Sequence, residues 1–287
     1  MNKFIKLYNG VQMPIIGYGE YLVNPEVCVQ STIDAINSGY THIDTAISYM
    51  NEKEIGEAIS KSKIDRKDLF ITTKVWIYSI GYENTHKAIN DSLSKLNTNY
   101  LDLVLIHQPY GDYYGSWRAL EELYEKGVIK AIGVSNFSAE RLSDLIWNAK
   151  IKPMVNQIEI NPLAQRNELV KYCQENDIVV QAWSPLGGEA RIKEVINNKK
   201  LIKLSKIKNK TIPQIIIRWL IQKNIVPLVK SIKTDRIKEN IDVFDFELSS
   251  KEMEIINSIN KNSLLFDHST LEGIETLKKI LNSKKKR

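Results

Sequence analysis

The alternation of short apolar runs with segments of helical spacing constrains this chain more than any other feature. It extends from near residue 17 to near residue 243 and contains eight strand-then-helix units, with no linker between them. Continuous apolar runs are typical of parallel strands whose two faces are covered by helices. The expected strands are residues 17–21, 42–44, 69–75, 101–107, 128–134, 153–160, 177–183 and 225–229.

Eight uninterrupted units predict an α/β protein with a closed (β/α)₈ barrel, or TIM barrel, which commonly fills about 250 residues as one domain. We therefore expect residues 1–287 to form a single domain. An open, doubly wound sheet is the alternative, but the glycine pattern of its dinucleotide site is missing. Gly17-Tyr18-Gly19 is followed by Leu22, where a third glycine is required.

The segment before the first unit has the pattern of a β-hairpin. Apolar residues alternate in residues 4–7 and 11–15, and Asn9-Gly10 lies between them. Asn-Gly readily adopts the positive φ angles that a tight two-residue turn requires. We expect a separate antiparallel ribbon that closes the bottom of the barrel, and a tail of loop and helix after the last strand.

Composition limits the class of protein and its partners. Of the net charge of +6, the last four residues carry +4. The rest of the chain is therefore nearly neutral, and its charge does not indicate a basic surface that binds nucleic acid. No apolar run approaches the roughly 18 residues of a membrane span, and the N-terminus lacks the apolar segment of a signal peptide. The two cysteines, Cys28 and Cys173, form no paired motif. We expect a monomer in the reducing cytoplasm, with neither nucleic acid nor membrane as a partner.

Reactive side chains follow three successive strands of the predicted barrel. Asp44 ends one strand and Tyr49 lies in the loop after it, while the next two strands lead to Lys74 and His107. Barrel enzymes carry their reacting groups at the carboxyl ends of the strands, so we expect these four side chains to share one rim.

The four residue types suit proton transfer to a carbonyl oxygen. A free tyrosine has a pKa of about 10, and we expect the Lys74 ammonium to lower the pKa of Tyr49 while Asp44 orients the lysine. Tyr49 could then protonate an oxygen that gains negative charge, and His107 could direct that oxygen by a hydrogen bond. Taken singly, each residue also has a purely structural use, as a cap, an ion-pair partner, a buried histidine or an exposed ring.

Longer motifs in the chain include GYTHIDTAISYMNE (residues 39–52), ITTKVW (71–76), LDLVLIHQP (101–109) and AIGVSNF (131–137). They resemble motifs of the aldo-keto reductases, in particular of bacterial members such as the diketogluconate and methylglyoxal reductases. The resemblance covers nearly the whole chain. It implies a barrel that binds a nicotinamide cofactor without a Rossmann fold, and a catalytic tetrad at Asp44, Tyr49, Lys74 and His107.

A phosphate site is expected after the last strand. Lys230 and Ser231 end that strand, and Arg236 lies in the first turn of the next helix, which suits a phosphate dianion; a solvated basic loop is the alternative. By resemblance, these three residues bind the 2′-phosphate of NADPH, with Glu239 and Asn240 near the adenine. NADP(H) is therefore the expected cofactor.

The resemblance also implies a nicotinamide site on the other side of the rim. Its carboxamide would contact Ser135, Asn136 and Gln157, and Trp183 would stack on the ring in place of the usual tyrosine. The cofactor contacts implied next to it are Ser184 and Leu186.

The substrate pocket is expected at the same rim. Glu20 departs from the resemblance, since aldo-keto reductases often have a small polar residue after the first strand. The loop after His107 is short, which predicts an open pocket. Its aromatic and polar lining would come from Tyr21, Tyr49, Trp76, His107 and Tyr110.

Three functions remain open on the sequence alone. The first is NADPH-dependent reduction of aldehydes and ketones, and the second is a regulatory subunit that binds NADPH with little turnover. The third is a flavin-dependent barrel oxidoreductase. No metal is expected, because the four histidines show no ligand spacing with one another or with the cysteines.

Overall fold

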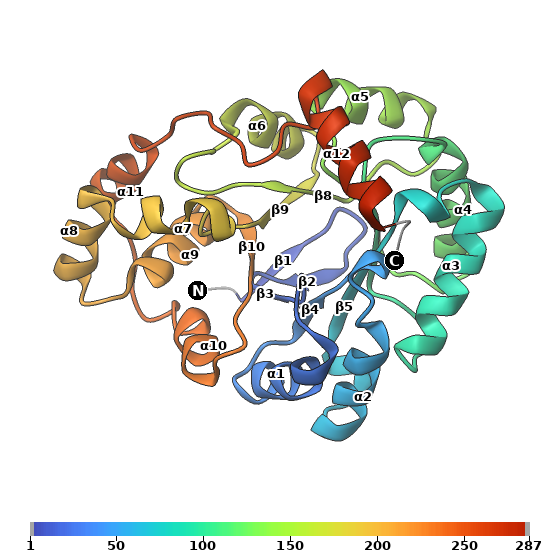
Figure 1. Ribbon diagram of the computed structural model, residues 1–287, viewed down its shortest axis with the longest axis horizontal. Coiled ribbons are helices and arrows are strands. Elements are labelled where there is room, and N and C mark those ends of the chain that lie inside the picture. The colour runs from blue at the N-terminus through green and yellow to red at the C-terminus, as the bar shows by residue number, and fades with distance from the viewer. Residues whose placement is uncertain (1–2, 285–287) are drawn as a thin grey trace.

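The computed structural model describes residues 3–284, and eight parallel strands in them form a closed barrel. Around the barrel the strands follow the order β10-β3-β4-β5-β6-β7-β8-β9, so each neighbour is the next strand along the chain and the last pairs with the first (Figure 1). The strands are β3 Gly17–Gly19, β4 His42–Asp44, β5 Phe70–Val75, β6 Leu103–Ile106, β7 Ile132–Ser135, β8 Val155–Glu159, β9 Val179–Trp183 and β10 Ile225–Val229. The predicted (β/α)₈ barrel is confirmed.

Helices surround the barrel, as Figure 1 shows, whereas α12 lies at one of its ends. Two of them begin at a capping box, in which Thr211 caps α9 and Ser249 caps α11. The α-helices are α1 Pro25–Asn37, α2 Glu52–Ser62, α3 Tyr82–Lys95, α4 Tyr113–Glu125, α5 Ala139–Asn148, α6 Asn167–Glu175, α7 Gly188–Ile196, α8 Lys199–Lys208, α9 Ile212–Gln222, α10 Thr234–Ile241, α11 Ser250–Asn257 and α12 Leu271–Lys284. Short 3₁₀ helices are η1 Ile47–Tyr49, η2 Arg66–Asp68 and η3 Ile77–Ser79.

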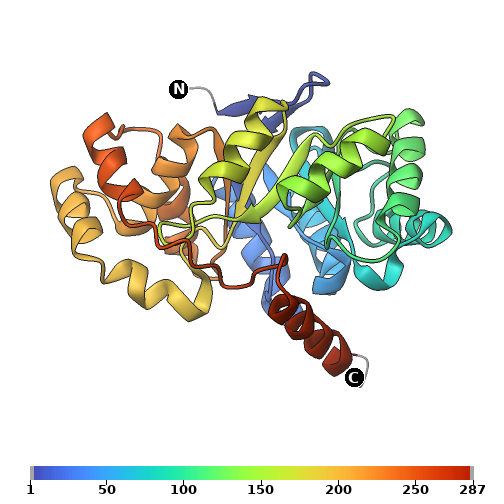
Figure 2. The same ribbon diagram turned by 90° about the horizontal axis from the view of Figure 1, so that it is seen from above.

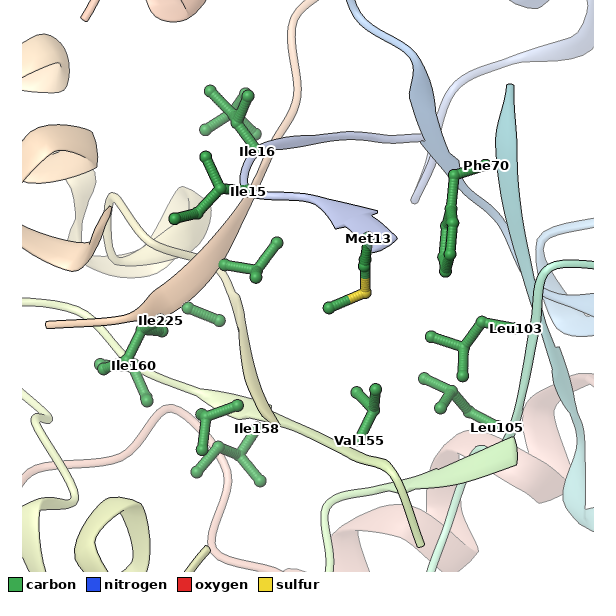
Figure 3. Close-up of a cluster of buried hydrophobic side chains, with 14 of the residues drawn as sticks. Met13, Ile15, Ile16, Phe70, Leu103, Leu105, Val155, Ile158, Ile160 and Ile225 are labelled. Atoms are coloured by element: carbon green, nitrogen blue, oxygen red, sulfur yellow. The ribbon is translucent and has the colours of Figure 1, made fainter. Parts of the chain in front are cut away.

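The N-terminal hairpin closes the bottom of the barrel, as expected. Its strands are β1 Phe4–Lys6 and β2 Gln12–Pro14, which pair antiparallel. Met13 is fully buried, and its sulfur accepts a hydrogen bond at 3.2 Å from the side-chain amide of Gln181. Figure 3 shows Met13 among the first residues of four strands, which are Phe70, Leu103, Val155 and Ile225.

The turn of the hairpin differs from the predicted two-residue turn. Only Gly10 has a positive φ, +94°, whereas Asn9 does not. Leu7 accepts a hydrogen bond from the Gly10 amide at 2.9 Å, and its own amide donates to Val11. The loop is therefore longer than two residues, and the glycine at its end has a left-handed conformation. Loops of this kind are the most common hairpin connections after two-residue turns.

The hairpin and helix α12 lie at opposite ends of the barrel, which Figure 2 shows from the side. Because all eight strands are parallel, their carboxyl ends meet at the rim opposite the hairpin. The loop-and-helix tail expected after the last strand is confirmed. Within residues 3–284 there is no helix both long and apolar enough to span a membrane. Most of the basic C-terminal tail, residues 285–287, lies outside the described residues.

Candidate active site

Asp44 and Lys74 form a buried ion pair at the carboxyl rim. Asp44 is the last residue of β4 and Lys74 lies near the end of the adjacent β5. The Lys74 ammonium donates to Oδ1 of Asp44 at 2.5 Å, to the carbonyl oxygen of Thr45 at 2.8 Å and to the hydroxyl oxygen of Tyr49 at 3.4 Å. The three donors of the ammonium therefore have three acceptors, and the lysine has a single orientation.

Two aromatic rings pack on the ring of Tyr49. The ring of Tyr21 lies 5.1 Å from that of Tyr49, and the His107 ring lies 5.7 Å away on an edge-to-face contact. Trp76 packs on His107 at 4.8 Å. The four predicted catalytic side chains are thus brought together at one rim, with Tyr21 and Trp76 beside them.

Burial and charge act in opposite directions on the ion pair. Burial raises the pKa of Asp44, while the Lys74 ammonium and a hydrogen bond from Gln157 lower it. Burial lowers the pKa of Lys74, and Asp44 raises it. The contact between them favours the charged form of both groups, which burial disfavours.

The expected direction of the Tyr49 pKa shift is wrong. Burial and the negative charge of Asp44 raise the pKa of Tyr49 well above 10, where we expected Lys74 to lower it. The closest contacts of the ammonium, at 2.5 and 2.8 Å, are with Asp44 and Thr45. Burial therefore raises the pKa of the Tyr49 phenol by more than the ammonium lowers it. Tyr49 is therefore a protonated phenol at neutral pH.

Polar side chains at the carboxyl ends of β7, β8 and β9 form one network. Ser135 donates to the carbonyl oxygen of Gln157 at 2.9 Å, and Asn136 donates to that of His107 at 3.1 Å. The Trp183 indole donates to Oδ1 of Asn136 at 2.8 Å, so its ring has a fixed orientation. Gln157 donates to Oδ2 of Asp44 at 2.8 Å and connects this network to the ion pair.

The expected phosphate residues lie at the carboxyl end of β10. Lys230 and Arg236 are exposed, and Arg236 is in the first turn of α10, as predicted. The Lys230 ammonium donates to the carbonyl oxygen of Leu22 at 3.2 Å. Farther along α10, Glu239 accepts a hydrogen bond from the Thr211 hydroxyl at 2.8 Å, while the Asn240 side chain is buried and 5% exposed.

The segment after β9 turns sharply into α7. Ser184 has a positive φ of +49° and accepts a hydrogen bond from Gly187, while Leu186 packs on the barrel core. From α7, Arg191 donates to the carbonyl oxygens of Ser263 and Leu264. This segment therefore contacts the part of the chain that leads to α12.

Residues 263–268, here called the C-terminal strap, are held at the same rim. The Leu265 amide donates to both carboxylate oxygens of Glu159, at 3.0 and 2.8 Å. The Tyr110 hydroxyl donates to the carbonyl oxygen of His268 at 2.5 Å. The loop after β6 therefore contacts the strap at the carboxyl rim.

Comparison with known proteins identifies the family. A model of the Aldo/keto reductase family matches residues 23–261. The chain belongs to this family. This aldo/keto reductase is 46% identical to the glyoxal reductase of Bacillus subtilis (strain 168) over 260 residues, which cover 90% of this chain and 93% of that protein.

Solved structures of other aldo-keto reductases share the fold. MGS-M4, an aldo-keto reductase from a Medee basin deep-sea metagenome library, has a TM-score of 0.91 and 44% identity, and the match covers 93% of this chain and 99% of that one. The Bombyx mori aldo-keto reductase in complex with NADP has a TM-score of 0.87 and 34% identity, covering 92% and 94%. The resemblance inferred from the motifs is confirmed.

The complete burial of Glu20 in this aldo/keto reductase could not be foreseen from the sequence. Glu20 is fully buried beside the ion pair, where its carboxylate accepts a hydrogen bond from Thr32 at 2.6 Å and its amide donates to the carbonyl oxygen of Asp44. Burial, opposed by hydrogen bonds from Thr32 and Cys28, raises the pKa of Glu20 to about 7. Its only signal in the sequence is an acidic residue at the end of an apolar strand.

Proposed function

We propose that this protein reduces aldehydes and ketones with NADPH, and that Tyr49 is the proton donor. The observation that carries the proposal is the chain of contacts from Asp44 through the Lys74 ammonium to the Tyr49 hydroxyl. The Tyr49 phenol, which its surroundings keep protonated, lies at the rim where barrel enzymes bind their substrates.

The charges in this chain of contacts suit a carbonyl that becomes an alcohol. Bound NADPH would supply a hydride to the carbonyl carbon. The carbonyl oxygen then gains the electron pair of the C=O π bond and takes the proton of the Tyr49 hydroxyl. The resulting phenolate lies beside the Lys74 ammonium, whose positive charge stabilises it, and Asp44 keeps that ammonium charged. The His107 ring, next to Tyr49, would donate a hydrogen bond to the same oxygen.

The cofactor would lie across the rim between two groups of residues. Lys230, Ser231 and Arg236 provide the charges and hydroxyl that a phosphate monoester requires, and this supports NADPH over NADH. Glu239 and Asn240 would lie near the adenine. On the other side, the network of Ser135, Asn136, Gln157 and Trp183 would contact the nicotinamide end. Ser184 and Leu186, in the segment after β9, would add further contacts with the cofactor.

Aromatic side chains would form the substrate pocket. Tyr21 and Trp76 flank Tyr49 and His107, and Tyr110 is held by the strap. These rings support binding of a carbonyl compound with an apolar part. The name of the Bacillus subtilis relative adds 2-oxoaldehydes, such as glyoxal, to the substrates that should be tested.

The proposal is tested by following NADPH absorbance with methylglyoxal and 4-nitrobenzaldehyde. We expect turnover to be faster with NADPH than with NADH. Binding of NADPH without turnover on a broad panel of carbonyl compounds would instead support the regulatory-subunit alternative. A protein that purifies with a yellow flavin would support the flavin alternative.

A further inference from the structure

The loop between β10 and α10 needs a fixed backbone in order to recognise a phosphate. Lys230 and Arg236 are exposed at its two ends, and Ile232 between them is 54% exposed. Long cationic side chains on a mobile loop lose conformational entropy when they converge on one group. A contact that holds the loop beforehand would reduce that loss.

Tyr18 of β3 makes such a contact with the loop. Its side chain is 1% exposed, and its hydroxyl donates to the carbonyl oxygen of Ser231 at 2.7 Å. Strand β3, which carries Tyr18, pairs with β10 at Val229, two residues before Ser231. Because the peptide group is planar, holding this carbonyl also fixes the plane of the peptide that joins Ser231 to Ile232.

Packing holds the Tyr18 ring under the loop. The ring of Tyr40 lies 5.7 Å away, and the Tyr40 hydroxyl donates to the carbonyl oxygen of Ile237 in α10 at 3.3 Å. Burial raises the pKa of Tyr18, so its hydroxyl remains a donor at any pH at which the protein is assayed. On the outer side, the Thr234 hydroxyl donates to Asp34 of α1 at 2.5 Å.

We propose that Tyr18 is a positioning residue for cofactor recognition. Its hydroxyl fixes the Ser231 backbone and thereby holds Lys230 and Ser231 where they can bind the 2′-phosphate. This inference rests on the proposed function, in which those residues bind NADPH. It goes beyond that function because it assigns part of the preference for NADPH over NADH to a residue that does not touch the cofactor.

The substitution Tyr18→Phe tests the inference, since it removes one hydroxyl and keeps the buried ring. Tyr8→Phe is the matched control, because the Tyr8 hydroxyl donates to the carbonyl oxygen of Lys152 at 2.6 Å, at the hairpin. Dissociation constants of NADPH and NADH are measured by quenching of tryptophan fluorescence, and KM and kcat by NADPH oxidation with 4-nitrobenzaldehyde.

We expect Tyr18→Phe to raise the Kd and KM for NADPH about three- to tenfold, the range of one lost hydrogen bond. The Kd for NADH should stay within about twofold of the wild-type value, since NADH has no 2′-phosphate. The kcat at saturating NADPH should stay within the same range, since it does not depend on cofactor affinity. Tyr8→Phe should leave all four values unchanged. In a double-variant cycle, Lys230→Ala should weaken NADPH binding less in the Tyr18→Phe protein than in the wild type.

Unchanged NADPH binding in Tyr18→Phe would overturn the inference, as would an equal loss for NADPH and NADH. A wild-type protein that does not prefer NADPH would overturn the proposed cofactor specificity, and the inference with it. That failure is visible before any variant is made, so the two are distinguishable.

Discussion

The Lys74 ammonium lies 2.5 Å from Oδ1 of Asp44, and the two side chains are 0% and 4% exposed. In this environment neither charge can be solvated by water if the other is removed. Removing one partner therefore leaves an unpaired buried charge, which destabilises the folded protein far more than the intact ion pair stabilises it.

Replacing Asp44 with Asn should both destabilise the protein and reduce its activity. We expect the free energy of unfolding to fall by about 3–5 kcal/mol because the Lys74 ammonium loses its counter-charge. The kcat for carbonyl reduction should fall at least about 100-fold. Urea unfolding and NADPH oxidation measure the two effects. Asp65→Asn, which removes an exposed ion pair with Lys67, is the control and should change neither. A stable, active Asp44→Asn protein would refute this account of the pair.

Glu20→Gln should remove a pH dependence of stability. Folded Glu20 has a pKa of about 7, against an ordinary value of 4.5, so the folded protein keeps a proton that the unfolded chain loses. The stabilisation that this proton provides is present below pH 4.5 and is lost as the pH rises toward 7. Relative to the wild type, Glu20→Gln should therefore gain stability over this range, reaching about 2–3 kcal/mol at pH 8.

Chemical denaturation at pH 4.5, 6 and 8 checks this prediction. Glu26→Gln, an exposed substitution on α1, serves as the control and should follow the wild type at each pH. Parallel stability curves for Glu20→Gln and the wild type would contradict the buried, protonated state of Glu20.

Glu159→Ala should loosen the C-terminal strap without affecting the cofactor. The Leu265 amide then loses both carboxylate acceptors, whereas the contacts of Lys74 and Tyr49 are unchanged. We expect the KM for 4-nitrobenzaldehyde to rise about tenfold, in line with a hydrogen bond to a charged group, and the Kd for NADPH to stay constant.

The control for the strap is Glu194→Ala. It breaks an exposed ion pair with Lys261, just before the strap, and should leave the KM unchanged. Limited proteolysis should cut Glu159→Ala faster than the wild type near residues 263–268. Equal KM values and equal cleavage would mean that Glu159 does not hold the strap in solution.

The barrel and the position of its rim could be predicted from the sequence because both depend on local patterns. A strand buried on both faces is a continuous apolar run, and the residue that ends the run lies at the rim. Asp44 and Lys74 were found in this way. The hairpin was predicted for the same reason, although the geometry of its turn depends on the pairing of Leu7 with Val11.

Contacts between distant segments could not be predicted. Leu265 and Glu159 are 106 residues apart, and no sequence pattern connects them. The direction of the Tyr49 pKa shift depends on how deeply the folded chain buries the phenol, which the types of the nearby residues do not reveal. The Tyr18 hydroxyl bond to Ser231 likewise becomes visible only when β3 and β10 close the barrel.

Tyr49→Phe tests the central claim most directly, because it removes the proposed proton donor and keeps the ring. Tyr21→Phe removes the neighbouring phenol, 5.1 Å away between ring centres, and is the matched control. The account predicts that kcat for 4-nitrobenzaldehyde falls about 100- to 10,000-fold in Tyr49→Phe, with NADPH affinity and thermal stability close to those of the wild type. A Tyr49→Phe protein that reduces the aldehyde at a rate near that of Tyr21→Phe would contradict it.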